Sequence, residues 1–225
     1  MNRLLWSLLG LLALSACTAD PKNASNVPAN TAAPTTPAIR KNIVFFGNSL
    51  TAAYQLSPEQ GFVAIIQRRI DSLQLSYRCV NAGISGETTA DGKSRIGWVL
   101  QQPMDIFVLE LGANDALRGL PIAQSVTNLQ AIADSVHLRY PNCRMVVAGM
   151  LAPPNLGATY TNGFRTMYSE LARHNNAALI PFLLENVGGI ATLNLADGIH
   201  PNPTGQKIVA ENVWRVLQPL LQSGG

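Results

Sequence analysis

The residues best suited to chemistry are a serine, a histidine and an aspartate near the two ends of one domain. Ser49 follows the apolar run 43–46 and Gly47, so a buried strand would end just before it. Asp197 and His200 stand close together before the last helical pattern. Such a set could transfer acyl groups, because the histidine takes the serine proton and the aspartate orients the histidine. A strand that ends in Gly-polar-Ser is common, so this prediction depends on the rest of the chain.

Acyl transfer also needs hydrogen-bond donors for the oxygen that becomes negative. The Ser49 N–H and the Asn114 side-chain amide are two candidates, each just after an apolar run. A third is a backbone N–H in the glycine-rich turn 82–89, where Gly83 and Gly86 both qualify. Ser49 is also expected to open a helix, whose N-terminal dipole would favour negative charge.

The elements that would position these groups alternate along the chain. Apolar runs predict strands, over residues 43–46, 77–81, 104–111, 144–150 and 178–181. Apolar residues at helical spacing predict helices between them, over residues 57–73, 89–100, 121–139, 162–174 and from 204 onward. This alternation predicts a parallel sheet covered on both faces, which is a three-layer α/β/α sandwich. The carboxyl ends of parallel strands share one edge, so the candidate residues would converge there.

The N-terminal part of the sequence predicts export. A short basic start precedes residues 4–14, an almost continuously apolar segment that is too short to span a bilayer. Small residues before Cys17 resemble the lipobox of bacterial lipoproteins, which implies a signal peptide over residues 1–16 and a lipid on that cysteine. A plain signal peptide cut near Cys17 is the alternative. Residues 17–38 are rich in Pro, Ala, Asn and Thr and predict a flexible tether to one domain, residues 39–225.

Composition excludes several partners. The formal net charge of the 225 residues is +3, and no basic cluster points to nucleic acid. Cys79 and Cys143 show no pairing signature and are expected to be free thiols. No His, Cys or Asp group has metal-ligand spacing, so neither a metal nor another cofactor is expected. The chain is expected to be a monomer. It is expected to be exported and anchored through Cys17 to the periplasmic or cell-surface face of a membrane.

Four blocks of sequence, in order along the whole domain, carry a family resemblance. They are Gly47-Asn48-Ser49-Leu50, residues 81–86, Gly112-Ala113-Asn114-Asp115 and Asp197-Gly198-Ile199-His200. Together they resemble the SGNH hydrolase family, also called GDSL esterases. Residues 84–88, 110–119 and 197–202 are most similar to its exported bacterial acyl-CoA thioesterase, lysophospholipase and arylesterase group.

The resemblance implies a flavodoxin-like SGNH fold with a five-stranded parallel sheet. It implies Ser49 as nucleophile, His200 as general base and then acid, and Asp197 as the group that orients His200. The oxyanion donors would be Ser49, Gly86 and Asn114, so the alignment favours Gly86 between the two candidate glycines. The substrates implied are small-molecule acyl esters or thioesters, cleaved through an acyl-enzyme.

One position departs from the family pattern. The usual Asp before the nucleophile, which braces the nucleophile turn in the family, is Asn48 here. Asparagine keeps an oxygen acceptor of the same size, so the turn geometry can persist. The lost charge is expected to shift the pH profile, and an Asn48→Asp variant is expected to keep the fold.

Other conspicuous residues are expected to have structural roles. Asp115 would cap the helix that follows it, and Glu87 and Glu110 would be turn and strand-end groups. Two histidines and two tryptophans in helical segments would be solvated or packing residues, namely His137, His174, Trp98 and Trp214. The segment 151–161 matches a region that covers the acyl site in similar enzymes, and a plain connecting loop is the alternative.

Three functions compete at this stage. The first is a lipid-anchored serine esterase that acts on acyl esters or thioesters. The second is a cell-envelope carbohydrate O-deacetylase, which would prefer acetyl groups. The third is a non-catalytic lipoprotein that binds acyl chains or peptidoglycan, and the intact Ser49, Asp197 and His200 argue against it.

Overall fold

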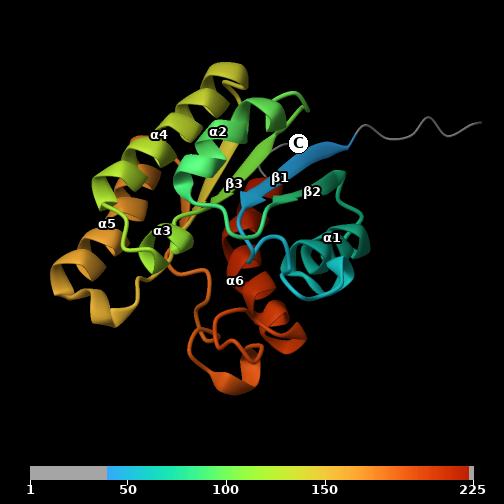
Figure 1. Cartoon of the computed structure of the whole chain (residues 1–225). Coiled ribbons are helices and arrows are strands. Elements are labelled where there is room, and N and C mark those ends of the chain that lie inside the picture. Colours follow the sequence, from blue (N-terminus) through green and yellow to red (C-terminus); the bar gives the residue numbers. More distant parts are fainter. Residues whose placement is uncertain (1–39, 223–225) are drawn as a thin grey trace, which may run out of the picture. The chain divides into compact units, whose positions relative to one another are not determined.

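A central parallel sheet organises the part of the chain that the computed structural model describes, residues 40–222. Its five strands are β1 (Lys41–Gly47), β2 (Tyr77–Gly83), β3 (Ile106–Glu110), β4 (Arg144–Ala148) and β5 (Ala178–Ile180). They lie in the order β2-β1-β3-β4-β5, and every pairing is parallel (Figure 1). The predicted signal peptide, Cys17 and the whole of the predicted tether lie outside the described residues.

The central strands owe their place to continuous apolar sequence. Residues 43–46 of β1 are at most 1% exposed, and all five residues of β3 are buried. A parallel strand with helices on both faces has no solvent side, so it can consist of unbroken Ile, Val, Leu and Phe. In the edge strand β2 only Tyr77 is buried, and the other six residues are exposed or half-buried.

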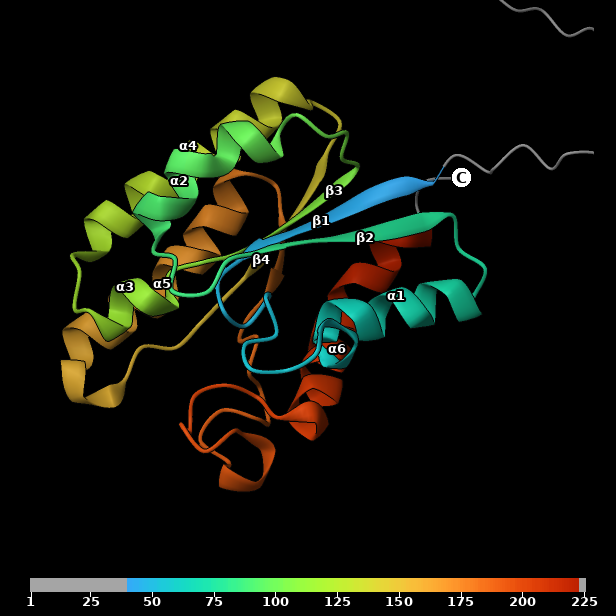
Figure 2. The same cartoon turned by 45° about the vertical axis from the view of Figure 1, so that its right-hand side comes forward.

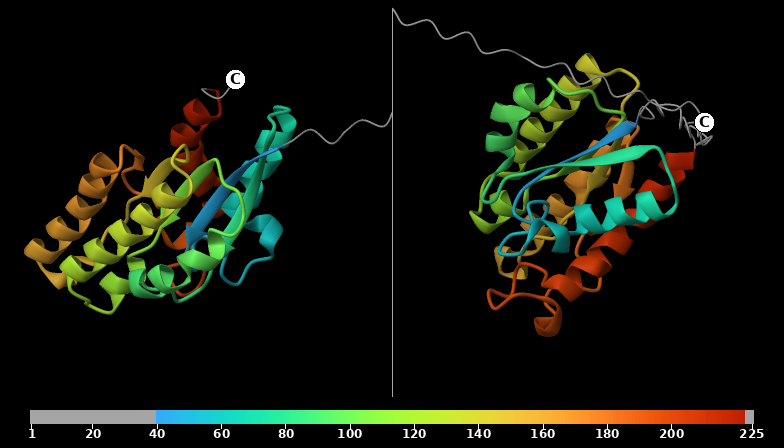
Figure 3. Two further views of the ribbon diagram at one scale, coloured as in Figure 1. Left: turned by 90° about the horizontal axis from the view of Figure 1, so that it is seen from above. Right: turned by 90° about the vertical axis from the view of Figure 1, so that its right-hand side faces the viewer.

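Helices cover both faces of the sheet. Helices α1 (Phe62–Ser72) and α6 (Pro203–Gln222) pack together on one face. The other face carries α2 (Thr89–Val99), α4 (Ile122–Arg139) and α5 (Ala158–His174), as Figures 2 and 3 show. The predicted three-layer α/β/α sandwich with five parallel strands is therefore confirmed.

Several local predictions differ from the structure. Ser57 caps a short 3-10 turn, η1 (Pro58–Gln60), and α1 begins only at Phe62. A one-turn helix, α3 (Ala113–Leu117), follows β3 where only a loop was expected. It starts after Gly112, whose φ of 115° lets the chain turn sharply out of the strand. Two further 3-10 turns are η2 (Pro154–Leu156) and η3 (Ala191–Leu193).

The prediction for Asp115 is wrong. Its buried carboxylate accepts the Thr89 N–H at 2.9 Å and the Thr89 Oγ1 hydrogen at 2.5 Å, so it serves the first turn of α2. It also accepts the Ser125 hydroxyl at 3.0 Å. The capped helix precedes Asp115 in sequence, because the fold places α2 beside α3 and α4.

Some of the other residues that were expected to be structural match the expectation, and one does not. Cys79 and Cys143 are free, and burial raises the pKa of each thiol to about 12. Trp214 is buried beneath the Arg69 guanidinium, as expected of a packing residue, whereas Trp98 is 70% exposed and does not pack. The two predicted helical histidines lie in the last turns of α4 and α5.

Within residues 40–222, none of the helices is long and apolar enough to cross a membrane. The same part of the chain contains no cluster of three or more His, Cys, Asp or Glu side chains arranged to hold a metal ion.

Candidate active site

The predicted site residues meet at the carboxyl edge of the sheet. From β1 the chain goes to β2 on one side and then to β3 on the other, and ligands of such sheets bind where the order reverses. A pocket of about 350 Å³ lies there, and Ser49, Gly86, Asn114 and His200 line it. Residues separated by up to 151 positions in sequence therefore share one cavity.

The serine, histidine and aspartate form a continuous hydrogen-bonded chain. His200 Nε2 lies 2.8 Å from Ser49 Oγ, and His200 Nδ1 lies 2.7 Å from Asp197 Oδ2. Because Nδ1 faces a carboxylate it carries the ring proton, which leaves Nε2 as the acceptor for the serine hydroxyl. This arrangement lets the imidazole remove the Ser49 proton.

A tight loop holds the aspartate and the histidine. The backbone N–H groups of Ile199 and His200 donate to Asp197 Oδ1 at 2.9 and 3.0 Å. These bonds, the His200 N–H first, lower the pKa of Asp197 to about 2. Gly198 between them has a φ of 70°, a conformation that glycine adopts without steric cost. The Asp197 carboxylate is therefore ionised throughout the neutral range.

Tyr54 is a site residue that the sequence did not reveal. Its ring packs against the His200 ring, with the centroids 4.6 Å apart, and it lines the same pocket. This contact restricts rotation of the imidazole. Tyr54 belongs to an irregular turn with no periodic pattern, so no sequence signal could have identified it.

No helix opens at Ser49, so that prediction is wrong. After Gly47 the chain makes an irregular turn in which the Ala52 N–H donates to Asn48 O at 3.0 Å. Ala53 and Gln55 then adopt φ angles of 57° and 58°, which end any helical continuation. A helix dipole consequently contributes nothing at this serine.

The structure separates the two candidate glycines. Gly86, with φ of 85°, lines the pocket, and the space beside its Cα is open. The Gly83 N–H donates to Asn81 Oδ1 at 3.0 Å, and a Cβ there would lie 2.5 Å from Ala52 N. Gly83 therefore packs against the turn that carries Ser49, and Gly86 faces the cavity.

The Asn114 amide is fixed from behind. One N–H of its Nδ2 donates to Glu87 O at 2.9 Å, and the side chain lines the pocket from the first turn of α3. The same amide carries a second hydrogen that a bound oxygen could accept.

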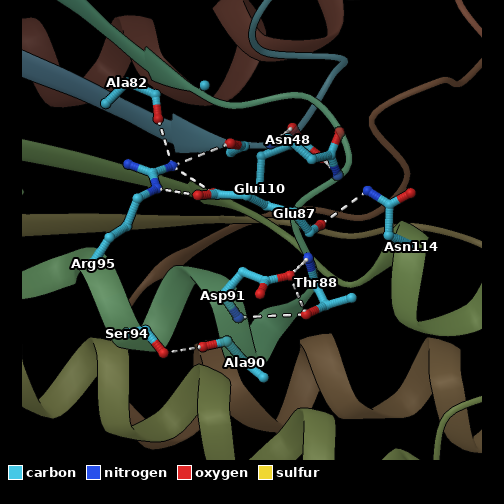
Figure 4. A network of polar contacts seen from close by, with 12 residues as sticks. Asn48, Ala82, Glu87, Thr88, Ala90, Asp91, Ser94, Arg95, Glu110 and Asn114 are labelled. Atoms are coloured by element: carbon cyan, nitrogen blue, oxygen red, sulfur yellow. Dashed lines mark hydrogen bonds and ion pairs between the residues drawn. The ribbon is translucent and has the colours of Figure 1, made fainter.

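Arg95 on α2, which the sequence did not single out, connects the turn that carries Ser49 with the turn that carries Gly86 (Figure 4). Arg95 donates through Nε and Nη2 to both oxygens of Glu87, the Nη2 bond being 2.7 Å long. Its Nη2 also lies 2.8 Å from Ala82 O and 3.4 Å from Gly47 O. The guanidinium stacks 4.1 Å above the Phe46 ring. The structural role that was expected of Glu87 is therefore to form this ion pair with Arg95.

The family model of the GDSL-like lipases and acylhydrolases matches residues 45–208 of this chain. That range includes all four blocks and every pocket residue described above. The chain belongs to this family.

Known proteins agree with this assignment. The chain is 40% identical to Esterase TesA of Pseudomonas aeruginosa over 185 residues, which are 82% of this chain and 91% of that protein. It is 33% identical to thioesterase 1/protease 1/lysophospholipase L1 of Escherichia coli K12, over 80% of this chain and 84% of that protein. The crystal structure of the psychrotrophic esterase EstA from Pseudoalteromonas sp. superposes with a TM-score of 0.76 at 31% identity, over 81% of this chain and 99% of that chain.

As an acylhydrolase of this family, the protein is a carboxylic ester hydrolase. Its pocket is walled mainly by apolar side chains, including Leu117, Met150, Leu184 and Ile199. A second hollow shares these four residues and continues past Leu151, Ala152, Pro153, Pro154 and Phe182. The first part of the segment 151–161, which was expected to cover an acyl site, thus lies beside the pocket.

Proposed function

We propose that this acylhydrolase is a serine esterase that cleaves acyl esters or thioesters through Ser49, His200 and Asp197. The observation that carries the proposal is the unbroken chain of contacts, 2.8 Å from Ser49 Oγ to His200 Nε2 and 2.7 Å from Nδ1 to Asp197. An ionised carboxylate, a correctly oriented imidazole and a hydroxyl in one hydrogen-bonded chain are the components of this chemistry.

The reaction follows from these positions. Ser49 Oγ attacks the acyl carbon while its proton moves to His200 Nε2, and Asp197 stabilises the imidazolium. The tetrahedral intermediate then expels the alcohol or thiol, which takes the proton from Nε2 and leaves an acyl-serine. Water repeats both steps, releases the acid and restores the Ser49 hydroxyl.

Three donors would hold the intermediate's negative oxygen. They are the backbone N–H groups of Ser49 and Gly86 and the second hydrogen of the Asn114 amide. Gly86 and Asn114 both line the pocket that contains Ser49, which supports their assignment as donors to one bound oxygen. Removing one such donor typically slows an enzyme about a hundredfold or more.

The apolar walls indicate the acyl side of the substrate. The pocket and the adjoining hollow share several apolar lining residues, which supports a binding site for more than an acetyl group. Apolar contact of this kind stabilises a chain by about 0.8 kcal/mol for each buried methylene. We therefore propose that medium or long acyl chains are preferred. The relatives' names, an esterase and a thioesterase with lysophospholipase activity, are compatible with this preference.

Membrane attachment is part of the proposal and derives from the sequence alone. Signal peptide cleavage after residue 16 and a lipid on Cys17 would anchor the exported domain through the tether. The domain is entered at β1, whose first residues lie at the sheet edge opposite the pocket. Cys17→Ala is expected to release the protein from the membrane fraction of cells that express it, and retention of that variant would contradict lipidation.

The direct test uses residues 38–225 and p-nitrophenyl esters from acetyl to palmitoyl. We expect turnover that peaks on medium or long chains and disappears in Ser49→Ala. Ser94→Ala is the matched control, because Ser94 is exposed on α2 and bonds only to Ala90 O. Activity confined to acetyl esters would favour the deacetylase, and no Ser49-dependent turnover would favour the binding lipoprotein.

A second readout identifies the nucleophile without a substrate. EstA is described as inhibited by monoethylphosphonate. A reactive ethylphosphonate ester should add one phosphonyl group to the wild-type domain, seen by intact-mass measurement. The adduct should be absent from Ser49→Ala and present in Ser94→Ala. An adduct on Ser49→Ala would contradict the proposal.

A further inference from the structure

A buried carboxylate lies directly beneath the turn that carries Ser49, and the reaction above does not use it. Glu110, the last residue of β3, is 1% exposed. Its Oε2 accepts the Asn48 N–H at 3.1 Å and the Thr51 hydroxyl at 2.8 Å. Its Oε1 accepts an Asn48 Nδ2 hydrogen at 2.8 Å. All these donors are neutral, and all belong to the nucleophile turn.

The orientation of the Asn48 amide is determined by its other contacts. Asn48 Oδ1 lies 3.0 Å from the Leu50 N–H and 3.4 Å from Ser49 Oγ. A backbone N–H can only donate, so Oδ1 must face Leu50 and Nδ2 must face Glu110. An amide nitrogen in that position needs an accepting oxygen opposite it. An ionised Glu110 provides one.

The turn is closed tightly around this carboxylate. A Cβ at Gly47 would lie 2.4 Å from Glu110 Oε2 and 2.2 Å from Thr51 Oγ1, so only glycine fits there. Burial raises the pKa of Glu110 to about 7, and the donors from Thr51 and Asn48 limit the rise. Losing the charge would therefore rearrange contacts on both sides of Ser49.

We propose that Glu110 is a positioning residue that holds Ser49 through the Asn48 amide, and that its ionised form is the competent one. The proposal rests on the proposed role of Ser49 as nucleophile. It also explains why an asparagine can occupy position 48. An aspartate at this position would bring two carboxyl groups to within 2.8 Å, where both cannot be ionised. The amide replaces the protonated partner of such a pair and needs no proton.

Other charged groups near Glu110 do not obscure its titration. On α2, Arg95 reaches Gly47 O and is paired with Glu87. On α5, the buried Tyr168 donates to Leu111 O, and its pKa is raised well above the ordinary value by burial and by nearby carboxylates, Glu110 first. Tyr168 thus stays neutral at working pH. His200 titrates on the other side of Ser49 and must be separated by variants.

The central experiment exchanges the two groups. Wild type, Glu110→Gln, Asn48→Asp and the double variant Asn48→Asp/Glu110→Gln are compared by kcat, KM and pH profile. Glu110→Gln should lower kcat about tenfold at pH 8 with little change in KM, because one charge-assisted hydrogen bond is lost. Asn48→Asp should lose activity as pH rises, because its carboxyl pair must keep one proton. The double variant restores one carboxylate and one amide and should be faster than either single variant.

Glu185→Gln is the matched control, since Glu185 is exposed, pairs with Arg215 and is not among the residues that line the pocket or the adjoining hollow. The proposal is overturned if Glu110→Gln keeps kcat within about twofold of wild type from pH 6 to 9, less than half a kcal/mol. It is also overturned if the double variant Asn48→Asp/Glu110→Gln has a kcat no higher than that of either single variant.

A milder variant covers the case in which Glu110→Gln fails to fold. Thr51→Val keeps the side-chain shape and removes only the hydroxyl donor to Glu110. Loss of that donor should raise the pKa of Glu110 and move the acid limb of the kcat profile upward by up to about one pH unit. An unmoved limb would overturn the proposal.

A stability measurement separates this proposal from the assignment of the nucleophile. The unfolding free energies of Ser49→Ala and Ser49→Ala/Glu110→Gln are measured across a pH range, and the second is subtracted from the first. This difference should fall as pH rises from 4.5 to about 7, and then level off. The sign follows because the folded state holds the Glu110 proton more tightly than the unfolded chain does. A flat difference would refute the buried titration even if Ser49 is catalytic.

Discussion

Two buried glutamates support the two turns at the pocket edge of the sheet, the Ser49 turn and the Gly86 turn, and their charges are compensated in different ways. Glu87 beneath the Gly86 turn meets the Arg95 guanidinium through both carboxylate oxygens. Glu110 beneath the Ser49 turn meets only neutral amide and hydroxyl donors. Both lie near the carboxyl ends of strands of one sheet, Glu87 in the turn after β2 and Glu110 at the end of β3, so the difference comes from their partners.

The comparison shows how one sheet combines a turn held by an ion pair with a turn held by a carboxylate that can titrate. The Arg95–Glu87 pair also binds Ala82 O and Gly47 O, so it ties the ends of β2 and β1 together. Neutral donors cannot offset the desolvation of Glu110 fully, and its pKa rises toward neutrality. We therefore expect the Gly86 turn to depend on an ion pair and the Ser49 turn to depend on pH.

Arg95→Met tests the ion pair and should have the largest effect on stability. It leaves the Glu87 carboxylate buried without its cation, a change that typically costs about 3–5 kcal/mol. Urea unfolding measures the loss. The double variant Arg95→Met/Glu87→Gln should recover most of it, because no buried charge remains. A loss below about 1 kcal/mol in the single variant would mean that the pair is screened like a surface ion pair.

Asn114→Ala tests what the Gly86 turn holds in place. The Asn114 amide is anchored on Glu87 O and is proposed to stabilise the oxyanion. Its removal should lower kcat about 10²- to 10³-fold and leave KM nearly unchanged. Ester hydrolysis measures both constants, with Gln124→Ala on the exposed face of α4 as control. A change confined to KM would assign the amide to substrate binding instead.

Gly47→Ala tests how closely the Ser49 turn is packed. The added methyl would meet Thr51 Oγ1 and Glu110 Oε2 well inside van der Waals contact. Overpacking of this kind typically costs about 1–3 kcal/mol, and the displaced carboxylate should also lower kcat. Thermal or urea unfolding, together with the rate at pH 8, checks both expectations. Wild-type stability would show that the turn opens more easily than its contacts indicate.

Gly86→Ala is the corresponding change in the other turn and should have the smallest effect. The space beside Gly86 is open, so the cost comes from its φ of 85° alone, about 1–2 kcal/mol. Its unfolding free energy should exceed that of Gly47→Ala. The reverse order would contradict the picture of a crowded Ser49 turn and an open Gly86 turn.

Local sequence was sufficient for the framework. Continuous apolar runs predicted β1 and β3 because a buried parallel strand needs both faces apolar. The four blocks predicted which residues would meet, because strand ends in a parallel sheet share one edge. Ser49, His200 and Asp197 lie in contact at the positions that the sequence analysis selected.

The errors and omissions involve groups whose partners are distant in the chain or whose backbone is irregular. Asp115 was assigned to the wrong helix, and Trp98 was expected to pack although it is exposed. Arg95 and Tyr54 carried no signal at all. The helix expected at Ser49 is replaced by a turn with left-handed residues, which local propensity did not predict.

The sequence by itself determined the layers, the strand-end turns and which candidate side chains would meet, because these depend on periodicity and on short motifs. Only the tertiary structure decided which carboxylate meets a cation and which meets neutral donors. Glu110 and the Asn48 amide are 62 residues apart, and Arg95 reaches the end of β1 across 48 residues. Contacts of that separation exist only after the sheet has formed, and the desolvation that shifts the pKa of Glu110 exists only in the folded core.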